Sequence, residues 1–489
     1  MKQEGLNLTI IEAIQDRNLL GASFKDLSTW RAWFSFLKAI YCLPMEPEEL
    51  EIFRAATGLE RPPAEPPKEI FVIAGRRSGK SFIASLIAVF ESCFKDWSNI
   101  LSPGEVGFYA ITAADRKQAK IIMNYVRGFL ENSPVLQKMV RGYYKEEIEL
   151  QNRVNLDIKT CNFRSIRGYT LIGATFEEVA FWRSEEFSAN PDKEVYRATL
   201  PGLSTTGGRL LAISTPYSKA GLLFEKFQSH YGKEGDVLIW RAPTQIMNPT
   251  ISQELIARAL EEDPEGAKSE WLSEFRQDIE SFISLETLQA CVVPGRQFLP
   301  PDPSKSYIGF IDPSGGSNDS FTLAIAHCEG ERIIIDQLLE RRPPFSPQDV
   351  VREFAAILRQ YNIRSVISDR YAGEWVREVF IKEGIGLDYS ELTASELYLE
   401  TLPLLAAGKV ELPDHPRLLN QFSSLERRVR AGGKDLITHP PGGHDDLANS
   451  VSGSIYYSNK TGRHFFRIWS PIDDRPSEAA INFMAGKRS

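Results

Sequence analysis

The sequence of 489 residues predicts an α/β protein built from two successive units, each a sheet covered by helices. Strand-like apolar runs alternate with helical runs from residue 66 to about residue 280, and this alternation starts again at residue 306. A proline-rich stretch separates the two series. A hydrophobic content of 42% and a charged content of 25% are typical of a globular protein with a substantial core.

Residues 1–65 predict a helical N-terminal or lid region, with helices over 28–43 and 47–56. Residues 66–280 predict the first α/β domain. Its expected strands cover 70–73, 106–112, 154–158, 171–176 and 209–213, and its expected helices cover 80–94, 115–131 and the stretch 252–278. Residues 281–305 are expected to be a linker, because Gln297–Lys305 is rich in proline and polar residues.

Residues 306–460 predict the second α/β domain, which opens with strands over 307–311, 321–327 and 332–338. A C-terminal tail, 461–489, shows no clear period. No apolar run reaches the ~18 residues of a membrane span, and the N-terminus has no signal-peptide core, so we expect a cytoplasmic protein. The net charge of -8 argues against a global positive field but leaves room for local basic patches.

A phosphate-binding loop is predicted where an apolar strand runs through AGRRSGKS into a helix. Lys80 is expected to reach the β- and γ-phosphates of ATP, and Ser81 to bind Mg²⁺. The backbone of the loop is expected to cradle the phosphates. Its residues are Ala74, Gly75, Arg76, Arg77, Ser78 and Gly79. The loop departs from the strict GxxxxGK[ST] pattern at Ala74, although Gly75 beside it keeps the backbone pliable.

An acidic partner for this loop is expected at the end of a neighbouring strand, where LIGATFEEVAFW carries Glu177 and Glu178. Glu177 would support Mg²⁺, and Glu178 would orient or deprotonate the attacking water. Asp is commoner than Glu at the first of these positions, so the division of roles between the two glutamates stays open. A solvated pair of glutamates at a strand end is the structural alternative.

An arginine just before this strand would stabilise transition-state charge, including that on a neighbouring subunit. Arg167 is the candidate arginine finger, with Arg164, Arg76 and Arg77 as open alternatives and a structural role equally compatible. Ser-Thr-Pro at 214–216 ends a further strand, where small hydroxyl groups would sense the γ-phosphate.

Three acidic positions in the second domain point to a metal site. Asp312 ends one strand, Asp369 ends another, and Asp445 opens a helix. Carboxylates gathered in this way form the two-metal cluster of RNase H-like nucleases, in which one Mg²⁺ or Mn²⁺ activates water and a second, ~4 Å away, steadies the leaving oxygen. Each acid taken alone is more often a cap or turn residue than a metal ligand. The roles of Asp319, His444 and Asp446 stay open.

Basic residues cluster just before the last of these acids, and they would either contact phosphates or form a solvated face. They are Arg427, Arg428, Arg430 and Lys434. Five cysteines lie tens of residues apart and predict reduced, mostly buried thiols rather than a zinc site.

Taken in order, these motifs resemble the large terminase subunit of tailed bacteriophages. The resemblance runs over roughly residues 40–457 and rests on AGRRSGKS, ADRKQA, ATFEEVAFW, STP and GHDDLANS. It implies a P-loop ATPase of the ASCE, RecA-like type that drives double-stranded DNA into a prohead, followed by an RNase H-like nuclease that cuts concatemeric DNA. ATP and Mg²⁺ are the implied cofactors, with Mn²⁺ an alternative at the nuclease site.

The resemblance also implies partners and a location. A homo-oligomeric ring would dock on the portal protein, a small terminase subunit would recognise the DNA, and no membrane would be involved. The motor would work in the host cytoplasm on the prohead and would not remain in the mature virion.

Two other classes of function stay open. A helicase-like or repair ATPase fused to a nuclease would be expected to show helicase motifs on a second RecA-like lobe, and the sequence has a single P-loop. A non-catalytic portal or scaffold component that binds DNA would not be expected to carry two complete sets of acids.

Overall fold

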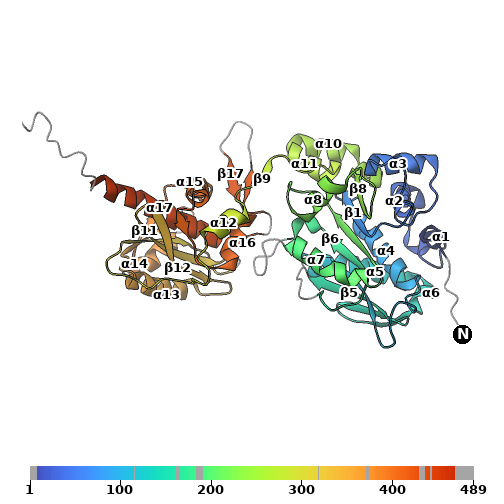
Figure 1. Cartoon of the computed structure of the whole chain (residues 1–489), viewed down its shortest axis with the longest axis horizontal. Coiled ribbons are helices and arrows are strands. Elements are labelled where there is room, and N and C mark those ends of the chain that lie inside the picture. The colour runs from blue at the N-terminus through green and yellow to red at the C-terminus, as the bar shows by residue number, and fades with distance from the viewer. Residues whose placement is uncertain are drawn as a thin grey trace, which may run out of the picture. The chain divides into compact units, whose positions relative to one another are not determined.

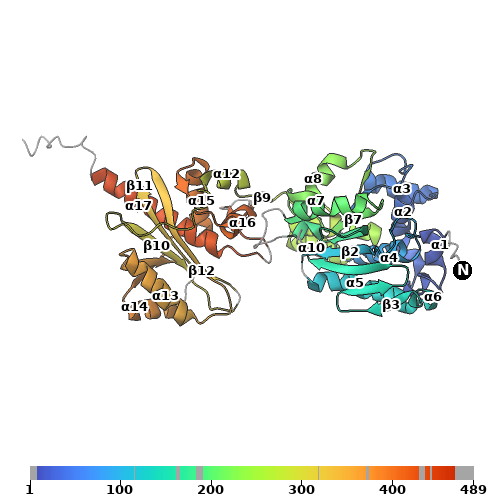
Figure 2. The same ribbon diagram turned by 60° about the horizontal axis from the view of Figure 1, so that its bottom comes forward.

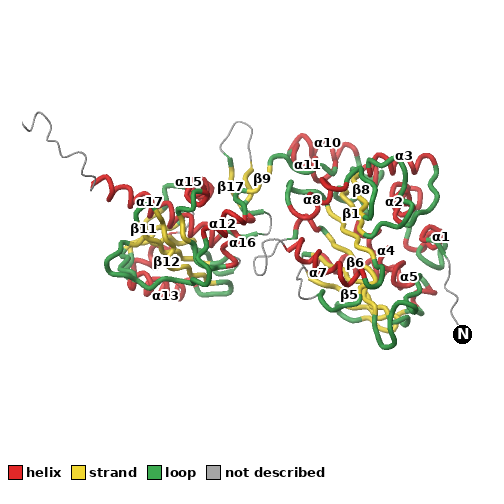
Figure 3. The backbone as a smooth tube through the Cα atoms, in the orientation of Figure 1, coloured by secondary structure: helices red, strands yellow, loops and turns green. Residues whose placement is uncertain are grey.

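The computed structural model describes residues 8–114, 116–160, 166–182, 191–317, 319–369, 374–428, 435–440 and 443–468. Within the described residues the chain divides into unit 1, which ends at Glu280, and unit 2, which begins at Ser281. In each unit the strands gather into a sheet with helices on both sides (Figure 3), so the predicted α/β class is confirmed. None of the helices in the described ranges is both long and apolar enough to span a membrane.

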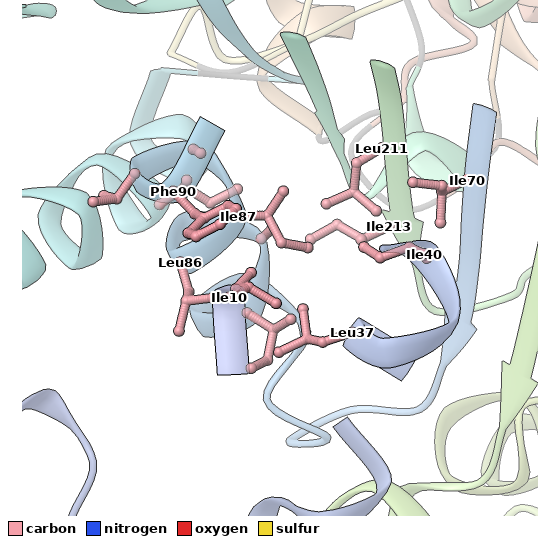
Figure 4. Close-up of a cluster of buried hydrophobic side chains, with 14 of the residues drawn as sticks. Ile10, Leu37, Ile40, Ile70, Leu86, Ile87, Phe90, Leu211 and Ile213 are labelled. Carbon is pink, nitrogen blue, oxygen red and sulfur yellow. The ribbon is translucent and has the colours of Figure 1, made fainter. Parts of the chain in front are cut away.

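The N-terminal helices pack on the sheet of unit 1. They are α1 (Ile10–Gln15), α2 (Arg31–Ile40) and α3 (Pro47–Thr57), with 3₁₀ turns at Gly21–Ser23 and Leu27–Trp30. In Figure 4, Ile10 and Leu37 face Leu86 and Ile87 of the helix α4 (Lys80–Cys93), so both layers share one buried core. The helical region predicted for residues 1–65 therefore contributes to the same core as the sheet that follows it.

Unit 1 is built on an eight-stranded sheet in the order β3-β4-β5-β2-β6-β7-β1-β8. In that order the strands are Val140–Tyr143, Glu147–Leu150, Val154–Thr160, Gly107–Ala113, Leu171–Glu177, Arg209–Ser214, Glu69–Ala74 and Val237–Ala242. The six strands from β5 to β8 run parallel, while β3 and β4 form an antiparallel edge. Strand β7 therefore lies between β1, which leads into the P-loop, and β6, which ends in Glu177.

Helices cover both faces of this sheet (Figure 1). Besides α4 they are α5 (Arg116–Asn132), α6 (Pro134–Gln137), α7 (Pro191–Ser204), α8 (Gly221–His230), α9 (Thr244–Met247), α10 (Gln253–Glu262) and α11 (Pro264–Leu272). The helical stretch predicted over 252–278 is interrupted at Asp263, because the side chain of Asp263 caps α11 and Pro264 begins it. The edge strands β3 and β4 and the strand β8 were not predicted.

Unit 2 has a six-stranded sheet in the order β14-β13-β10-β11-β12-β15. In that order the strands are Gly386–Tyr389, Ser365–Ser368, Tyr307–Asp312, Phe321–Glu329, Arg332–Arg341 and Val410–Glu411. Strands β10, β11 and β12 form an antiparallel meander, and β13 joins β10 in parallel. A small sheet, β17-β16-β9, is formed by Leu436–Thr438, Glu426–Arg428 and Ile279–Ser281.

The two faces of the larger sheet carry different helices (Figure 2). On one face lie α13 (Pro347–Gln360) and α14 (Glu374–Lys382), packed on a core around Ile311 and Phe354. On the other lie α12 (Leu285–Cys291), α15 (Ala394–Ala406), α16 (Pro416–Ser424) and α17 (Asp446–Ile468), packed around Ala326 and Val451. The start of α17 meets the sheet at the end where β10 finishes, and this positions the second candidate site.

The segment predicted as a linker, residues 281–305, is instead part of unit 2. Its first half contains α12, whose Leu288 and Cys291 are buried in the unit 2 core. Its proline-rich half is also attached, since Leu299 N–H donates to the Asp336 carbonyl at 2.7 Å. Proline content alone did not identify a linker here, because the apolar residues of α12, which precede the prolines, pack into the core of unit 2. At the other end α17 extends into the predicted tail as far as Ile468, and the rest of that tail lies outside the described residues.

The four cysteines in the described ranges are unpaired, as the sequence predicted. Cys291 is buried, while Cys42, Cys93 and Cys328 are partly buried. The fifth, Cys161, lies outside the described residues.

Candidate active sites

The predicted phosphate-binding loop connects β1 to α4, as its sequence suggested. Ala74 is still part of β1 and is fully buried, so the loop begins one residue later than the motif implies. A Cβ at Gly75 would lie 2.2 Å from Thr244 Oγ1 and 2.6 Å from the Glu270 carbonyl oxygen, so only glycine fits there. The glycine that close packing requires is Gly75, so alanine at position 74 is compatible with the loop.

The loop bends through left-handed backbone at Arg77 (φ 60°) and Gly79 (φ 94°). Such alternation creates a concave row of N–H groups that suits an anion. Arg76 is an exception among the predicted cradle residues, because its N–H donates to the Glu270 carbonyl at 2.7 Å. The Arg76 guanidinium also pairs with the Glu270 carboxylate, with Nε and Oε2 2.6 Å apart.

Lys80 is almost completely buried and joins the ends of three adjacent strands. Its Nζ lies 2.9 Å from Thr215 Oγ1, just after β7, and 3.1 Å from Glu178 Oε1, just after β6. The other Glu178 oxygen accepts from Thr215 N–H at 3.0 Å and from Ser214 Oγ at 3.1 Å. The structure thus unites Lys80, Glu178 and the Ser-Thr-Pro segment in one hydrogen-bonded cluster.

Glu178 holds this position through an unusual backbone. Its φ of 51° lies in the left-handed region, which costs a non-glycine residue on the order of 1 kcal/mol or more. Surrounding contacts fix the turn, because Glu178 N–H donates to the Ile213 carbonyl and Trp182 Nε1 donates to the Glu177 carbonyl. The left-handed backbone at Glu178 accompanies a carboxylate that contacts Lys80, so we include this turn in the candidate site.

Glu177 points to Ser81 rather than to Lys80. Ser81 Oγ donates to Glu177 Oε1 at 2.6 Å, while Oε2 is buried without a hydrogen-bond partner in the described structure. Burial, and then the negative charge of Glu178, raise the pKa of Glu177 to about 7, against smaller opposing effects of Ser81 and Lys80. A hydroxyl and a carboxylate with a spare buried oxygen are the hard donors that Mg²⁺ prefers, so these residues fit that ion.

Arg167 does not approach the P-loop of its own chain. It precedes β6, whereas Glu177 ends that strand, and the seven residues of β6 span ~20 Å. Arg167 instead lines a pocket of about 280 Å³ together with Tyr169 and Arg197. The alternative Arg164 lies outside the described residues.

The acids of unit 2 meet at one end of its sheet. Asp312 ends β10, Asp369 directly follows the neighbouring parallel strand β13, and Asp445 and Asp446 lie at the start of α17. The amide of Asn449 joins two of them, because its Nδ2 donates to Asp312 Oδ2 at 2.8 Å and to Asp369 Oδ2 at 2.9 Å. The acids end the first strand, follow the fourth and open the last helix, the order expected of an RNase H-like unit.

These carboxylates repel one another in a buried setting. The pKa of Asp312 is raised well above its usual value by burial, then by the charge of Asp446, and further by Asp369 and Asp445. The pKa of Asp446 is raised to about 7, chiefly by burial. A bound cation would relieve this repulsion, and carboxylate oxygens are its natural ligands, so the residues fit a Mg²⁺ or Mn²⁺ site.

No three His, Cys, Asp or Glu side chains among the described residues are arranged to hold a metal ion as they stand. Asp312 and Asp369 instead share the Asn449 amide as a common hydrogen-bond donor.

The two acids at the start of α17 have different surroundings. Asp445 Oδ2 accepts from the buried Tyr398 hydroxyl at 2.9 Å, and its pKa is raised mainly by burial. Asp446 is the strongest charged neighbour of Asp312, and it lies one helical turn before Asn449 on the same face of the helix. Sequence analysis chose Asp445 and left Asp446 open, and it missed Asn449 and Tyr398; the D-x-x-N spacing was the available signal for Asn449.

Beside this cluster, His444 and Asp319 pair with each other, with His444 Nδ1 3.1 Å from Asp319 Oδ1, and both act on the pKa of Asp446. Of the predicted basic cluster, Arg427 pairs with Asp435 and Arg428 with Glu426, while Arg430 and Lys434 lie outside the described residues.

Comparison with known proteins adds the following. Residues 41–272 match the family model described as the N-terminal P-loop domain of the uncharacterized protein MJ0330. The chain is 25% identical over 454 residues to the large terminase subunit of Thermus virus P23-45. This alignment covers 83% of this chain and 87% of the viral protein. It is similar to large terminase subunits along most of its length. The same identity and coverage hold for the large terminase subunit of Thermus phage G20c.

Among solved structures, the crystal structure of the large terminase of bacteriophage HK97 is 16% identical and covers 92% of this chain and 99% of that chain, with a TM-score of 0.40. The predicted resemblance to large terminase subunits is thus confirmed by the curated relatives.

The raised pKa of Glu177 predicts how the stability of the protein without nucleotide or metal depends on pH. A buried carboxyl with a pKa of about 7 favours folding while it is neutral, and this contribution is lost as the pH rises from about 4.5 through about 7. Glu177→Gln keeps a neutral side chain of the same shape. In urea unfolding at about pH 8 with a chelator, we expect the variant to be more stable than the wild type by up to about 3 kcal/mol.

At about pH 5 the two proteins should differ little, which serves as the internal control. An equal pH dependence in both proteins would contradict the assignment.

Proposed function

We propose that this chain is a DNA-packaging ATPase and endonuclease that acts as large terminase subunits do. One observation carries the proposal: a single chain combines a P-loop lysine bonded to an acidic turn with a separate buried cluster of carboxylates. The antiparallel meander of unit 2 differs from the parallel core of unit 1, so unit 2 is not a second RecA-like lobe. This difference counts against a helicase-like alternative.

ATP hydrolysis is assigned to the cluster around Lys80. Ser81 and Glu177 would hold Mg²⁺, which neutralises charge on the phosphates. Lys80 would bind the β- and γ-phosphates, which compete with Glu178 for the same ammonium. Glu178 would then be released to orient the attacking water. Thr215 is hydrogen-bonded to both Lys80 and Glu178 in this structure, so the loss of these bonds would alter the end of β7.

DNA cleavage is assigned to the carboxylates of unit 2. Asp312 and Asp369 would hold the catalytic Mg²⁺ or Mn²⁺, in a two-metal arrangement in which the ions activate water and steady the leaving oxygen. The third acid is taken from the pair at the start of α17. Asp445 was the choice from sequence, and the closeness of Asp446 to Asp312 favours Asp446 as the ligand, with Asp445 held by Tyr398.

Double-stranded DNA is the proposed substrate of both activities. Although the chain is acidic overall, residues 116–145 contain seven Lys or Arg and a single Glu. Several of these side chains are exposed, namely Lys117, Lys120, Lys138, Arg141 and Lys145, and the exposed Tyr143 contacts Arg127 in the same segment. Exposed basic side chains with an aromatic neighbour are suited to contacts with the phosphate backbone.

The partners follow from the same proposal. A homo-oligomeric ring on the portal protein would bring Arg167 of one subunit to the nucleotide of the next, which suits an arginine that lies away from its own P-loop. A small terminase subunit would select the DNA. The motor would act in the host cytoplasm, on the prohead.

Two substitutions should separate the activities. Lys80→Ala removes the buried ammonium and should reduce ATP hydrolysis at least a hundredfold, while Mn²⁺-dependent cleavage of plasmid DNA persists. Asp369→Asn should abolish cleavage and leave ATP hydrolysis within about twofold of wild type. Both activities are measured on the same preparations. Loss of ATP hydrolysis in Asp369→Asn, or normal hydrolysis in Lys80→Ala, would refute the assignment of one site to each unit.

A second pair tests which acid of α17 binds metal. Asp446→Asn should reduce plasmid cleavage at least a hundredfold, because it removes the charge that acts most strongly on Asp312. Asp445→Asn keeps a side-chain oxygen that accepts from Tyr398, so we expect a smaller loss of about tenfold or less. The opposite ranking of the two variants would restore Asp445 as the ligand and exclude Asp446.

A further inference from the structure

Three consecutive carbonyl groups of the phosphate-binding loop accept hydrogen bonds from side chains that lie far away in the sequence. The bonds run from Trp33 Nε1 to the Ser78 carbonyl at 2.7 Å, from Asn248 Nδ2 to the Arg77 carbonyl at 2.7 Å, and from Thr244 Oγ1 to the Arg76 carbonyl at 3.0 Å. We call Trp33, Thr244 and Asn248 the carbonyl clamp. Two separate regions supply it, since Trp33 belongs to α2, while Thr244 begins α9 and Asn248 follows it.

The clamp donors are themselves firmly held. Trp33 and Thr244 are fully buried, and the Thr244 side chain also fills the space beside Gly75. Asn248 is oriented by Thr250, whose N–H and hydroxyl both donate to Asn248 Oδ1, so that Nδ2 faces the loop. The orientation of these donors is therefore set by the fold around the loop.

Fixing these carbonyls also fixes the loop's N–H groups. In a planar trans peptide, the carbonyl of one residue and the N–H of the next point in opposite directions. Bonds to the carbonyls of residues 76, 77 and 78 therefore point the N–H groups of Arg77, Ser78 and Gly79 away from the respective clamp donors. Consecutive N–H groups on one side are the arrangement that binds a phosphate.

We propose that Trp33, Thr244 and Asn248 are positioning residues that hold the P-loop in its phosphate-binding form before the nucleotide arrives. This inference rests on the proposed ATPase function. The clamp touches neither Lys80 nor Glu178 through the bonds described, so its role is in binding the phosphates rather than in the hydrolysis step. Losing a clamp bond should weaken nucleotide binding, because part of the binding energy is then spent on ordering the loop.

The sharpest test uses Thr244, where shape can be separated from hydrogen bonding. Thr244→Val keeps the side-chain shape and removes the hydroxyl donor, whereas Thr244→Ser keeps the donor. We expect Thr244→Val to raise the KM for ATP by about 3- to 10-fold with kcat within about twofold, as suits the loss of one hydrogen bond. Thr244→Ser should restore a KM close to that of wild type.

Asn248→Ala provides a second test at a less buried position, with Gln245→Ala in the preceding helix α9 as its matched control. We expect a rise in KM similar to that of Thr244→Val, and no change in the control. The affinity for ADP, measured by titration calorimetry on the full chain, should fall by the same factor. Because Trp33→Phe would also leave a gap in the core, the two polar variants carry the test.

Lys80→Ala in the same series distinguishes the two levels of the argument. Normal ATP turnover in Lys80→Ala would overturn the proposed ATP site itself. If Lys80→Ala is inactive while Thr244→Val and Asn248→Ala retain wild-type KM and ADP affinity, the carbonyl clamp is refuted and the ATP site stands. A fall in kcat with unchanged KM in the clamp variants would also refute it.

Discussion

A buried ammonium group, that of Lys80, is the interaction on which the geometry of unit 1 depends. Removing it from water is costly unless polar and charged partners surround it, and these come from Glu178 and Thr215 at the ends of two adjacent strands. The order β6-β7-β1 brings them within reach, because the carboxyl ends of parallel strands lie at one edge of the sheet. The strained turn at Glu178 completes this arrangement.

Unit 2 faces the opposite electrostatic problem. Its buried groups are carboxylates, to which Asn449 and Tyr398 donate as neutral partners, while His439 and His444 oppose part of the rise in the pKa of Asp445. Burial first, and then the repulsion between the carboxylates, raise the pKa values of Asp312 and Asp446. A divalent cation would offset the charge of these carboxylates, whereas in unit 1 Lys80 pairs with Glu178 and only Glu177, bonded to Ser81, is left for Mg²⁺. The two units therefore differ in what they need from a ligand.

Local signals in the sequence predicted both candidate sites but not the residues that contact them. The P-loop is contiguous, so strand, Gly79, Lys80 and helix could be recognised together, and the close contact at Gly75 explains the departure at Ala74. Trp33 and Asn248 reach the loop across 45 and 171 residues, and no local pattern announces such contacts. To choose between Asp445 and Asp446 one must know where α17 begins and which side of the helix meets the sheet, and the sequence does not give this. The linker predicted at 281–305 differs from the structure because the prediction relied on proline content and not on the apolar residues of α12, which belong to the core of unit 2.

The central claim, one chain with an ATP site in unit 1 and a metal-dependent cutting site in unit 2, is tested most directly by locating bound metal. Crystals soaked in Mn²⁺ and measured by anomalous scattering should show a peak bonded to Asp312 and Asp369, with the Asn449 amide displaced from between them. A peak elsewhere, or no peak at a Mn²⁺ concentration that supports DNA cleavage, would contradict the account.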